Sequence, residues 1–324
     1  MLTTVFLGGA LGLASVLSVA GATESTAADD VSLTWGRYEL ILESAGAEPK
    51  HQLHAQPGPG IPLLYRFDQT LTLEMDDPRG GKASRTSSYP SLWVGFTPSH
   101  VVEDGKARRA VEIDSVVYPP TPDMTAALRR DMDGQIAALE GARIAWGVEP
   151  SGRATGADAT LSGNITNPPL AMTLIDELVF DWSLPFPDEP VGEGASWVCE
   201  GELPVRMVGP GARAKTRVEL SLVEIAEGQA KIELSFTRDS ERRGPTTDAP
   251  AQGAYHSKGT ATVLVDLESG YVVYGATDRT VDSEIPLPNG QEWELHLDVK
   301  SLVAIKAEDA TGPDANNPPS GDGE

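Results

Sequence analysis

Residues 184–197, Leu-Pro-Phe-Pro-Asp-Glu-Pro-Val-Gly-Glu-Gly-Ala-Ser-Trp, divide this chain into two parts. Three prolines and two glycines lie between apolar residues. We therefore expect an extended segment, then a turn, and then a strand that begins near Trp197. A helical pattern precedes the stretch and a long series of strand patterns follows it. The stretch is predicted to join two halves of the protein, and it carries no catalytic chemistry itself.

Beyond this joint, apolar and polar residues alternate with a period of two. Such alternation is typical of strands with one face on a core and the other in water. Gly228 and the segment 267–270 predict turns, and the charged, Pro- and Gly-containing segment 238–254 predicts a long exposed loop. The apolar positions are Val218, Leu220, Leu222, Ile232, Leu234, Phe236, Ala261, Val263, Val265, Trp293, Leu295, Leu297 and Val299.

The part before the joint mixes strands with helices. Strand patterns occur near residues 38–42, 65–75, 109–118 and 144–148, with a weaker one ending near 161, and the polar segment 76–91 predicts a mobile loop. A helix is predicted near 122–140, because Thr121 can cap it and apolar residues recur at spacings of four and three. A second helix is predicted between Asn167 and Trp182.

These patterns predict an α+β protein that is mostly β, with curved antiparallel sheets in two halves that each carry one packed helix. A hairpin pattern ending at residues 148–152 resembles one ending at 265–270, which fits either a duplication or ordinary hairpin statistics. The predicted boundaries are a signal peptide (1–22), a polar connector (23–32), an N-terminal half (33–165), a C-terminal half with the joint (166–306) and a disordered acidic tail (307–324).

The net charge of the 324-residue chain is −23 at pH 7. This charge argues against nucleic acid or an anionic membrane as a partner held by bulk attraction. A single cysteine, Cys199, cannot form a disulfide within the chain, and its place in a strand pattern favours a buried small hydrophobe over a reactive thiol.

Residues 5–20 form an uncharged apolar run that is followed by Ala20-Gly21-Ala22. A short apolar run before a small-x-small site is typical of a secretory signal, although no Lys or Arg precedes it. We expect cleavage near Ala22, export to the periplasm or the medium, and a mature chain without a transmembrane span. An uncleaved membrane anchor is the alternative.

The sequence predicts no catalytic residue, no metal site and no cofactor. Nucleophile-elbow, phosphate-loop and metalloprotease motifs are missing from it. His51 and His54 are the best metal candidates, but they lack a third ligand and are interpreted as an exposed pair. Asp131-Met-Asp133-Gly134 lies inside a predicted helix, so it is not interpreted as a calcium loop.

The joint motif resembles that of a family of exported bacterial proteins of unknown function. Those proteins show Leu-Pro, then Pro-Val, then Gly-x-x-Trp, between a helix and a β-rich second half, as residues 184–197 do here. The resemblance covers residues 35–305. This chain differs from the lipid-anchored members because it has no cysteine near the cleavage site. The resemblance implies a fold and a location outside the cytoplasm, and no activity.

We therefore expect an exported, non-catalytic protein of the bacterial envelope. Its expected partner is a hydrophobic small molecule or an envelope protein, since the sequence offers a β-sheet concavity without catalytic motifs. One alternative is an extracytoplasmic hydrolase with dispersed carboxylates, because Asp and Glu total 48 and a catalytic pair cannot be chosen among them by spacing. A structural surface protein is the other.

Overall fold

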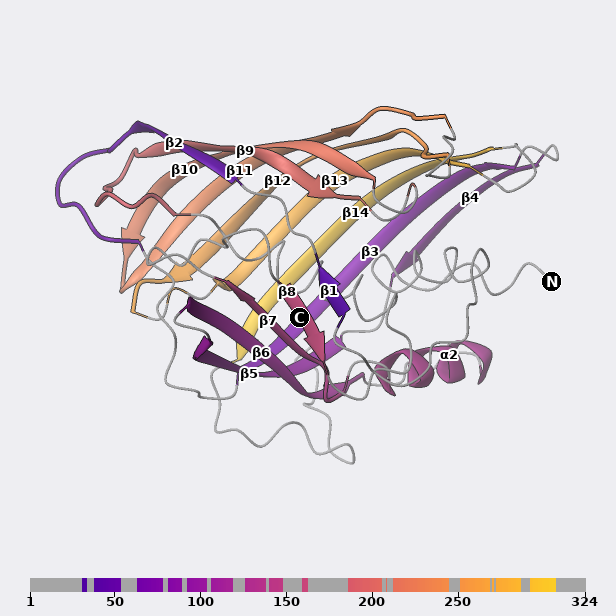
Figure 1. The fold of residues 1–324 in the computed structure, drawn as a ribbon, viewed down its shortest axis with the longest axis horizontal. Coiled ribbons are helices and arrows are strands. Elements are labelled where there is room, and N and C mark those ends of the chain that lie inside the picture. Colours follow the sequence, from indigo (N-terminus) through magenta and orange to yellow (C-terminus); the bar gives the residue numbers. More distant parts are fainter. Residues whose placement is uncertain are drawn as a thin grey trace, which may run out of the picture.

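The computed structural model confirms a mostly β protein built on one large, open antiparallel sheet (Figure 1). Its described residues are 31–33, 38–53, 63–77, 81–88, 92–103, 106–118, 126–137, 140–147, 159–162, 186–205, 208, 212–244, 251–268, 270, 272–286 and 292–306. The predicted signal peptide, the second helix, the acidic tail and His54 lie outside these residues.

Among the described residues, eight strands and one helix precede the joint. They are β1 (Val31–Leu33), β2 (Tyr38–Ser44), β3 (Leu63–Asp77), β4 (Gly81–Ser88), β5 (Leu92–Glu103), β6 (Lys106–Val117), α2 (Ala126–Ala137), β7 (Arg143–Gly147) and β8 (Ala159–Ser162). The helix expected near 122–140 is thus confirmed at α2. The first two residues of β1, Val31 and Ser32, lie within the predicted polar connector (23–32).

Six long strands follow the joint. They are β9 (Ser196–Pro204), β10 (Arg213–Ala226), β11 (Gln229–Ser240), β12 (Tyr255–Asp266), β13 (Val272–Pro286) and β14 (Glu292–Lys306). Each pairs antiparallel with the next along the chain, so this part of the sheet is a continuous meander. The turns predicted at Gly228 and at 267–270 are confirmed as the β10–β11 and β12–β13 connections.

β3 links the two parts of the sheet. Along one side it pairs with β14 over its whole length. Along the other side its first residues pair with β5 and its later residues pair with β4. The strands β5, β6, β7, β8 and β1 continue from the first of these pairings, and in Figure 1 they lie with α2 below the broad curved part of the sheet.

Alternating burial divides the broad sheet into an apolar face and a polar face. Along β12, and along β10 as far as Leu222, every second residue is buried or half-buried, as the period of two predicts. One buried cluster contains Trp197, Leu220, Leu222, Ile232 and Val263, and a second contains Tyr255, Val281, Leu295, Leu297 and Val299. Cys199 belongs to the first cluster, which confirms its predicted burial.

The joint packs against the segment that follows β2. His51 and Val191 exchange both backbone hydrogen bonds, with N···O distances of 2.7 and 2.9 Å. Gly192 approaches this segment so closely that a Cβ atom there would lie 1.7 Å from the carbonyl oxygen of Ala47. The chain then turns and enters β9, where Trp197 is fully buried, so the expected strand start is confirmed.

Two predicted loops were wrong in part. The segment 76–91 contains β4, which pairs with β3 in register from Asp77↔Gly81 to Thr70↔Ser88. β4 has few apolar residues because it is an edge strand, so it shows no period of two. At the other segment, β11 continues to Ser240, β12 begins at Tyr255, and Arg243 bridges to Gln252, which shortens the predicted loop.

Candidate ligand groove on the polar face of the sheet

A row of acids and histidines crosses the polar face at one level of the register. Asp239 on β11 lies opposite His256 on β12, which lies opposite Asp282 on β13. Asp282 in turn lies opposite His296 on β14, and His296 lies opposite Glu74 on β3. We call these five residues the histidine row. Because directly opposed side chains in an antiparallel sheet are neighbours, the pairing of five strands assembles it.

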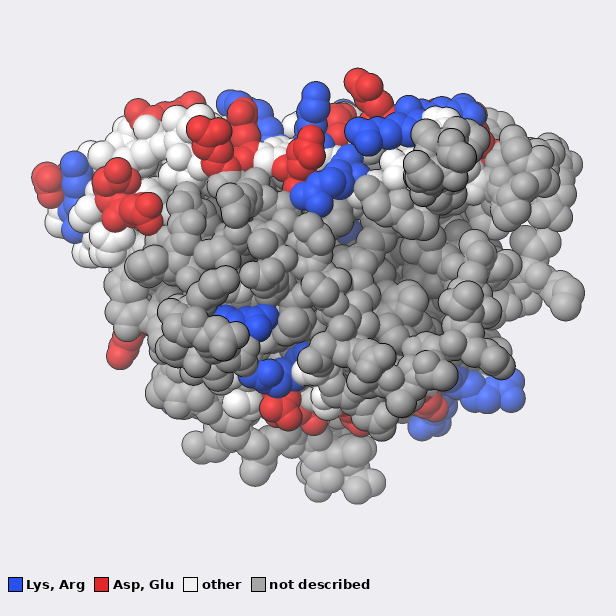
Figure 2. All heavy atoms as spheres, viewed as in Figure 1, with Lys and Arg blue, Asp and Glu red and all other residues white. Residues whose placement is uncertain are grey.

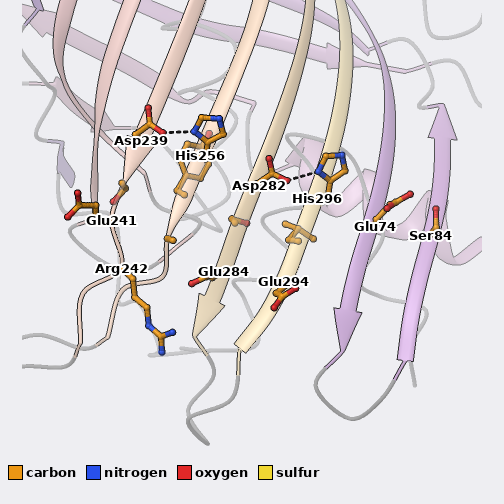
Figure 3. Close-up of a pocket in the computed structure, with 15 residues that line it drawn as sticks. Glu74, Ser84, Asp239, Glu241, Arg242, His256, Asp282, Glu284, Glu294 and His296 are labelled. Atoms are coloured by element: carbon orange, nitrogen blue, oxygen red, sulfur yellow. Dashed lines mark hydrogen bonds and ion pairs between the residues drawn. The ribbon is translucent and has the colours of Figure 1, made fainter.

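Each imidazole in the row contacts a carboxylate on the strand before its own. Nδ1 of His256 lies 2.5 Å from an oxygen of Asp239, and Nδ1 of His296 lies 2.6 Å from an oxygen of Asp282 (Figure 3). Nε2 of His296 also lies 3.6 Å from an oxygen of Asp298, two residues further along β14. His296 therefore has an acidic group near each ring nitrogen.

The surroundings of His296 favour its protonated form. The hydrogen bond to Asp282 raises the pKa of His296 above its usual value, and the charges of Asp282, Asp298 and Glu74 act in the same direction. Partial burial opposes them, because it disfavours the charged ring. The net effect is a raised pKa, so His296 takes up a proton at a higher pH than an isolated histidine.

The row forms one wall of an open groove with a volume of about 960 Å³. The groove also reaches the ends of the strands beyond the row, where acidic side chains predominate (Figure 3). One arginine, Arg242, lines it as well, and this side chain forms an ion pair with Glu292. The carboxylates that line the groove are Glu74, Asp239, Glu241, Asp282, Glu284 and Glu294.

Like charges face each other next to the histidine row. Glu284 on β13 lies opposite Glu294 on β14, which lies opposite Asp76 on β3. Opposed like charges destabilise a sheet. Within the described part of the chain, neither Glu284 nor Glu294 has an ion pair or a side-chain hydrogen bond that would offset this cost. A destabilising arrangement that neighbouring residues do not offset is typical of functional sites.

A second groove, of about 820 Å³, lies on the same face. It is lined mainly by Thr and Ser residues together with a few charges. Four carboxylates and one lysine are among its lining residues, so this groove is also acidic. Each of these carboxylates has a cation within ion-pair distance, and the pairs are Asp68 with Arg66, Glu219 with Arg217, Glu233 with Lys231 and Asp278 with Lys300. The acids of the second groove are thus compensated, whereas, in the part of the chain that the structure describes, Glu284 and Glu294 of the first groove are not.

The sign of the surface charge also varies over short distances. In Figure 2, Lys and Arg side chains are interspersed with Asp and Glu along the upper edge, where Figure 1 places the broad sheet. Arg217 is an example, since it contacts both Glu200 and Glu219, and these contacts raise its pKa further. Acidic side chains of this chain, whose net charge is −23, thus often have a cation beside them. Glu284 and Glu294 in the first groove differ, because they have no such cation among the described residues.

The residues that the sequence analysis considered lie elsewhere. His51 is half-buried at the joint, Cys199 is in the core, and Asp133 is on α2, where it accepts a hydrogen bond of 2.7 Å from the hydroxyl of Tyr118. Sequence reasoning placed His296 on the polar side of a strand, but it missed the row. The row depends on pairings among five strands, which no spacing along the chain reveals.

Neither a metal centre nor a membrane-spanning helix is found in the described ranges. No three His, Cys, Asp or Glu side chains there converge as metal ligands. None of the helical segments described has the length and apolar character needed to cross a bilayer. The carboxylates that line the groove can attract a cationic ligand, and His296 can take up a proton there.

Comparison with known proteins identifies no relative. No family model matches the chain, and no curated protein matches it. The family resemblance carried by the joint motif therefore stays a prediction. Only the geometry of the groove bears on function.

Proposed function

We propose that this protein is an exported, non-catalytic binding protein whose acidic groove holds a positively charged segment of an envelope partner. The observation that carries the proposal is the opposition of Glu284 and Glu294 at the groove without a compensating cation among the described residues. A Lys- or Arg-rich segment would supply the missing charge. Charge complementarity of this kind directs partner choice and association.

The groove favours a polar partner over a hydrophobic ligand. The largest buried side chains of the core, such as Trp197, Leu222 and Ile232, are less than 2% exposed, so they are already packed. Both grooves formed by described residues lie on the polar face. An envelope protein with a basic segment is therefore the better supported of the two partners expected from the sequence.

A binding experiment with the purified protein tests the proposal. We expect a fluorescent decapeptide of alternating Lys and Ser to bind at pH 8 and low salt, and a matched peptide of alternating Glu and Ser not to bind. Binding should weaken with salt, because exposed charges are screened. Equal binding of the two peptides would contradict the proposal.

A matched pair of variants locates the binding surface. Glu284→Gln with Glu294→Gln removes two charges from the groove and should weaken binding about threefold to thirtyfold, on the scale of two exposed ion pairs. Glu43→Gln with Glu268→Gln removes the same charge from exposed positions that do not line the groove. This second variant should bind as the wild type does, and a loss equal to that of the first would move the site elsewhere.

A hydrolase is the second candidate. The observation in its favour is the pairing of His296 with Asp282 in a groove, because a histidine oriented by a carboxylate can act as a general base. Three serines line the groove, Ser84, Ser240 and Ser283, and among the described residues none of them has a side-chain hydrogen bond to either imidazole. Turnover of simple esters that disappears in His296→Gln would support this alternative over binding.

Export and internal duplication complete the proposal. We propose cleavage of the signal near Ala22, and mass spectrometry of the mature N-terminus tests it. Two related halves, each with one packed helix, remain part of the proposal, as does membership of the exported family that the joint motif resembles. The helix α2 in the first half supports the arrangement in two halves with one helix each. The strand start at Trp197 after the joint supports membership of the exported family.

A further inference from the structure

We infer that the histidine row makes the groove pH-sensitive, so that protonation of His296 releases the basic partner as the pH falls. This inference rests on the proposed function and adds its regulation. It depends on where the two imidazoles lie within the groove and on which charged groups face them.

Carboxylates face both imidazoles from the neighbouring strands. His256 lies between Asp239 on β11 and Asp282 on β13. On its own strand, Lys258 shares the polar face two residues further along. His296 lies between Asp282 on β13 and Glu74 on β3.

His296 also has charged neighbours on its own strand. Asp298 contacts its ring, and Glu294 lies on the same face. Asp282 lies between His256 and His296, so a proton on His296 changes the charge at the centre of the groove.

Protonation of His296 changes the net charge of the groove. Six carboxylates and one guanidinium line it, and their charges sum to five net negative charges. A proton on His296 reduces this net charge to four. Because attraction for a basic segment depends on this net charge, a lower pH weakens binding, and a higher pH restores it.

The change falls near neutral pH. A histidine without special surroundings titrates near about 6.5. The raised pKa of His296 moves its protonation towards a higher pH, so the groove begins to lose negative charge before the carboxylates take up protons. The partner is therefore held under neutral or mildly alkaline conditions and released under mildly acidic ones.

Two measurements on the purified protein test the inference. The first is an NMR titration of the five histidines without any ligand, with the signals of the row assigned by their loss in His256→Asn and His296→Asn. We expect the His296 signal to titrate above about pH 6.5. A titration of His296 below that value would overturn the inference.

The second measurement is the affinity for the Lys-Ser decapeptide between pH 8 and pH 5.5. Wild-type affinity should fall about twofold to fivefold on acidification, on the scale of one exposed charge interaction. The variant His296→Asn cannot take up this proton and should keep most of its pH 8 affinity. An equal fall in wild type and variant would overturn the regulation while leaving the proposed function intact. No binding at pH 8 would overturn both.

Discussion

His296 and Asp282 lie directly opposite each other on β14 and β13, with Nδ1 of the imidazole 2.6 Å from a carboxylate oxygen. Both side chains are partly open to water, with 39% of the His296 side chain and 53% of the Asp282 side chain exposed. The pair therefore combines a short hydrogen bond with access for protons. It links two of the longest strands of the sheet and also forms the centre of the acidic groove.

This pair predicts a pH-dependent contribution to stability. The pKa of His296 is raised in the folded protein, so its contribution is fully present below the unfolded pKa of about 6.5 and is lost as the pH rises through the folded pKa. His296→Gln should therefore be less stable than wild type at pH 5.5, by less than about 1 kcal/mol because the pair is exposed. The difference should shrink by pH 8.5 in urea unfolding.

Two further variants control that prediction. Asp282→Asn should remove most of the same pH-dependent difference, because the hydrogen bond to Asp282 is the largest cause of the raised pKa. Glu43→Gln changes an exposed carboxylate outside the row and should leave the difference unchanged. A His296→Gln effect that grows with pH would contradict the assignment.

The β10–β11 turn predicts a stabilising substitution. The two-residue connection is Glu227-Gly228, and both residues have positive φ values, 51° and 78°. Positive φ at both positions is typical of a type I′ turn, which favours Asn-Gly. Glu227→Asn should therefore raise the free energy of unfolding by about 0.5–1 kcal/mol. Gly228→Ala should lower it, and thermal unfolding distinguishes the two directions.

Adjacent residues on β10 predict opposite sensitivities. The side chain of Leu222 is fully buried in the core, whereas Val223 is 42% exposed. Leu222→Ala should lower the free energy of unfolding by about 2–5 kcal/mol, because it removes buried methyl groups and leaves a cavity. Val223→Ala should change it by no more than about 0.5 kcal/mol. Similar losses in urea unfolding would contradict the assigned faces of the strand.

The close approach at the joint predicts that replacing Gly192 lowers the stability of the protein. A Cβ atom at Gly192 would lie 1.7 Å from the carbonyl oxygen of Ala47, so Gly192→Ala must separate the joint from the segment after β2. We expect a loss of about 1–3 kcal/mol, as for other overpacked positions. Gly244→Ala is the matched control, because nothing lies within 4 Å of its Cβ position. Equal stability of both variants would contradict the close approach.

α2 is connected to the sheet through Tyr118, whose hydroxyl lies 2.7 Å from a carboxylate oxygen of Asp133. Burial raises the pKa of Tyr118, and the hydrogen bond and charge of Asp133 add to the effect. Tyr118→Phe should therefore delete a phenol that ionises above its usual pH of about 10 in a spectrophotometric titration. Asp133→Asn should bring that ionisation closer to the usual pH.

Much of the fold followed from local pattern. Alternation in β10, β11, β12 and β14 predicted the buried face, since each apolar residue there must leave water while its neighbours stay hydrated. The spacing of Leu128, Met132 and Ile136 predicted the helix α2, whereas the predicted cap, Thr121, lies outside the described residues. β4 was missed because an edge strand needs few apolar side chains and takes its conformation from hydrogen bonds to β3.

The candidate groove could not be predicted from the local sequence pattern alone. Alternation along residues 293–299 already placed His296 on the polar side of its strand. The pairing of strands in the folded protein, which alternation did not predict, brings Asp282 and Glu74 beside His296, Asp239 beside His256, and Glu284 opposite Glu294. The physical reason is that register between strands is a property of pairs, set by turns and by packing across the whole sheet, whereas alternation is a property of each strand alone.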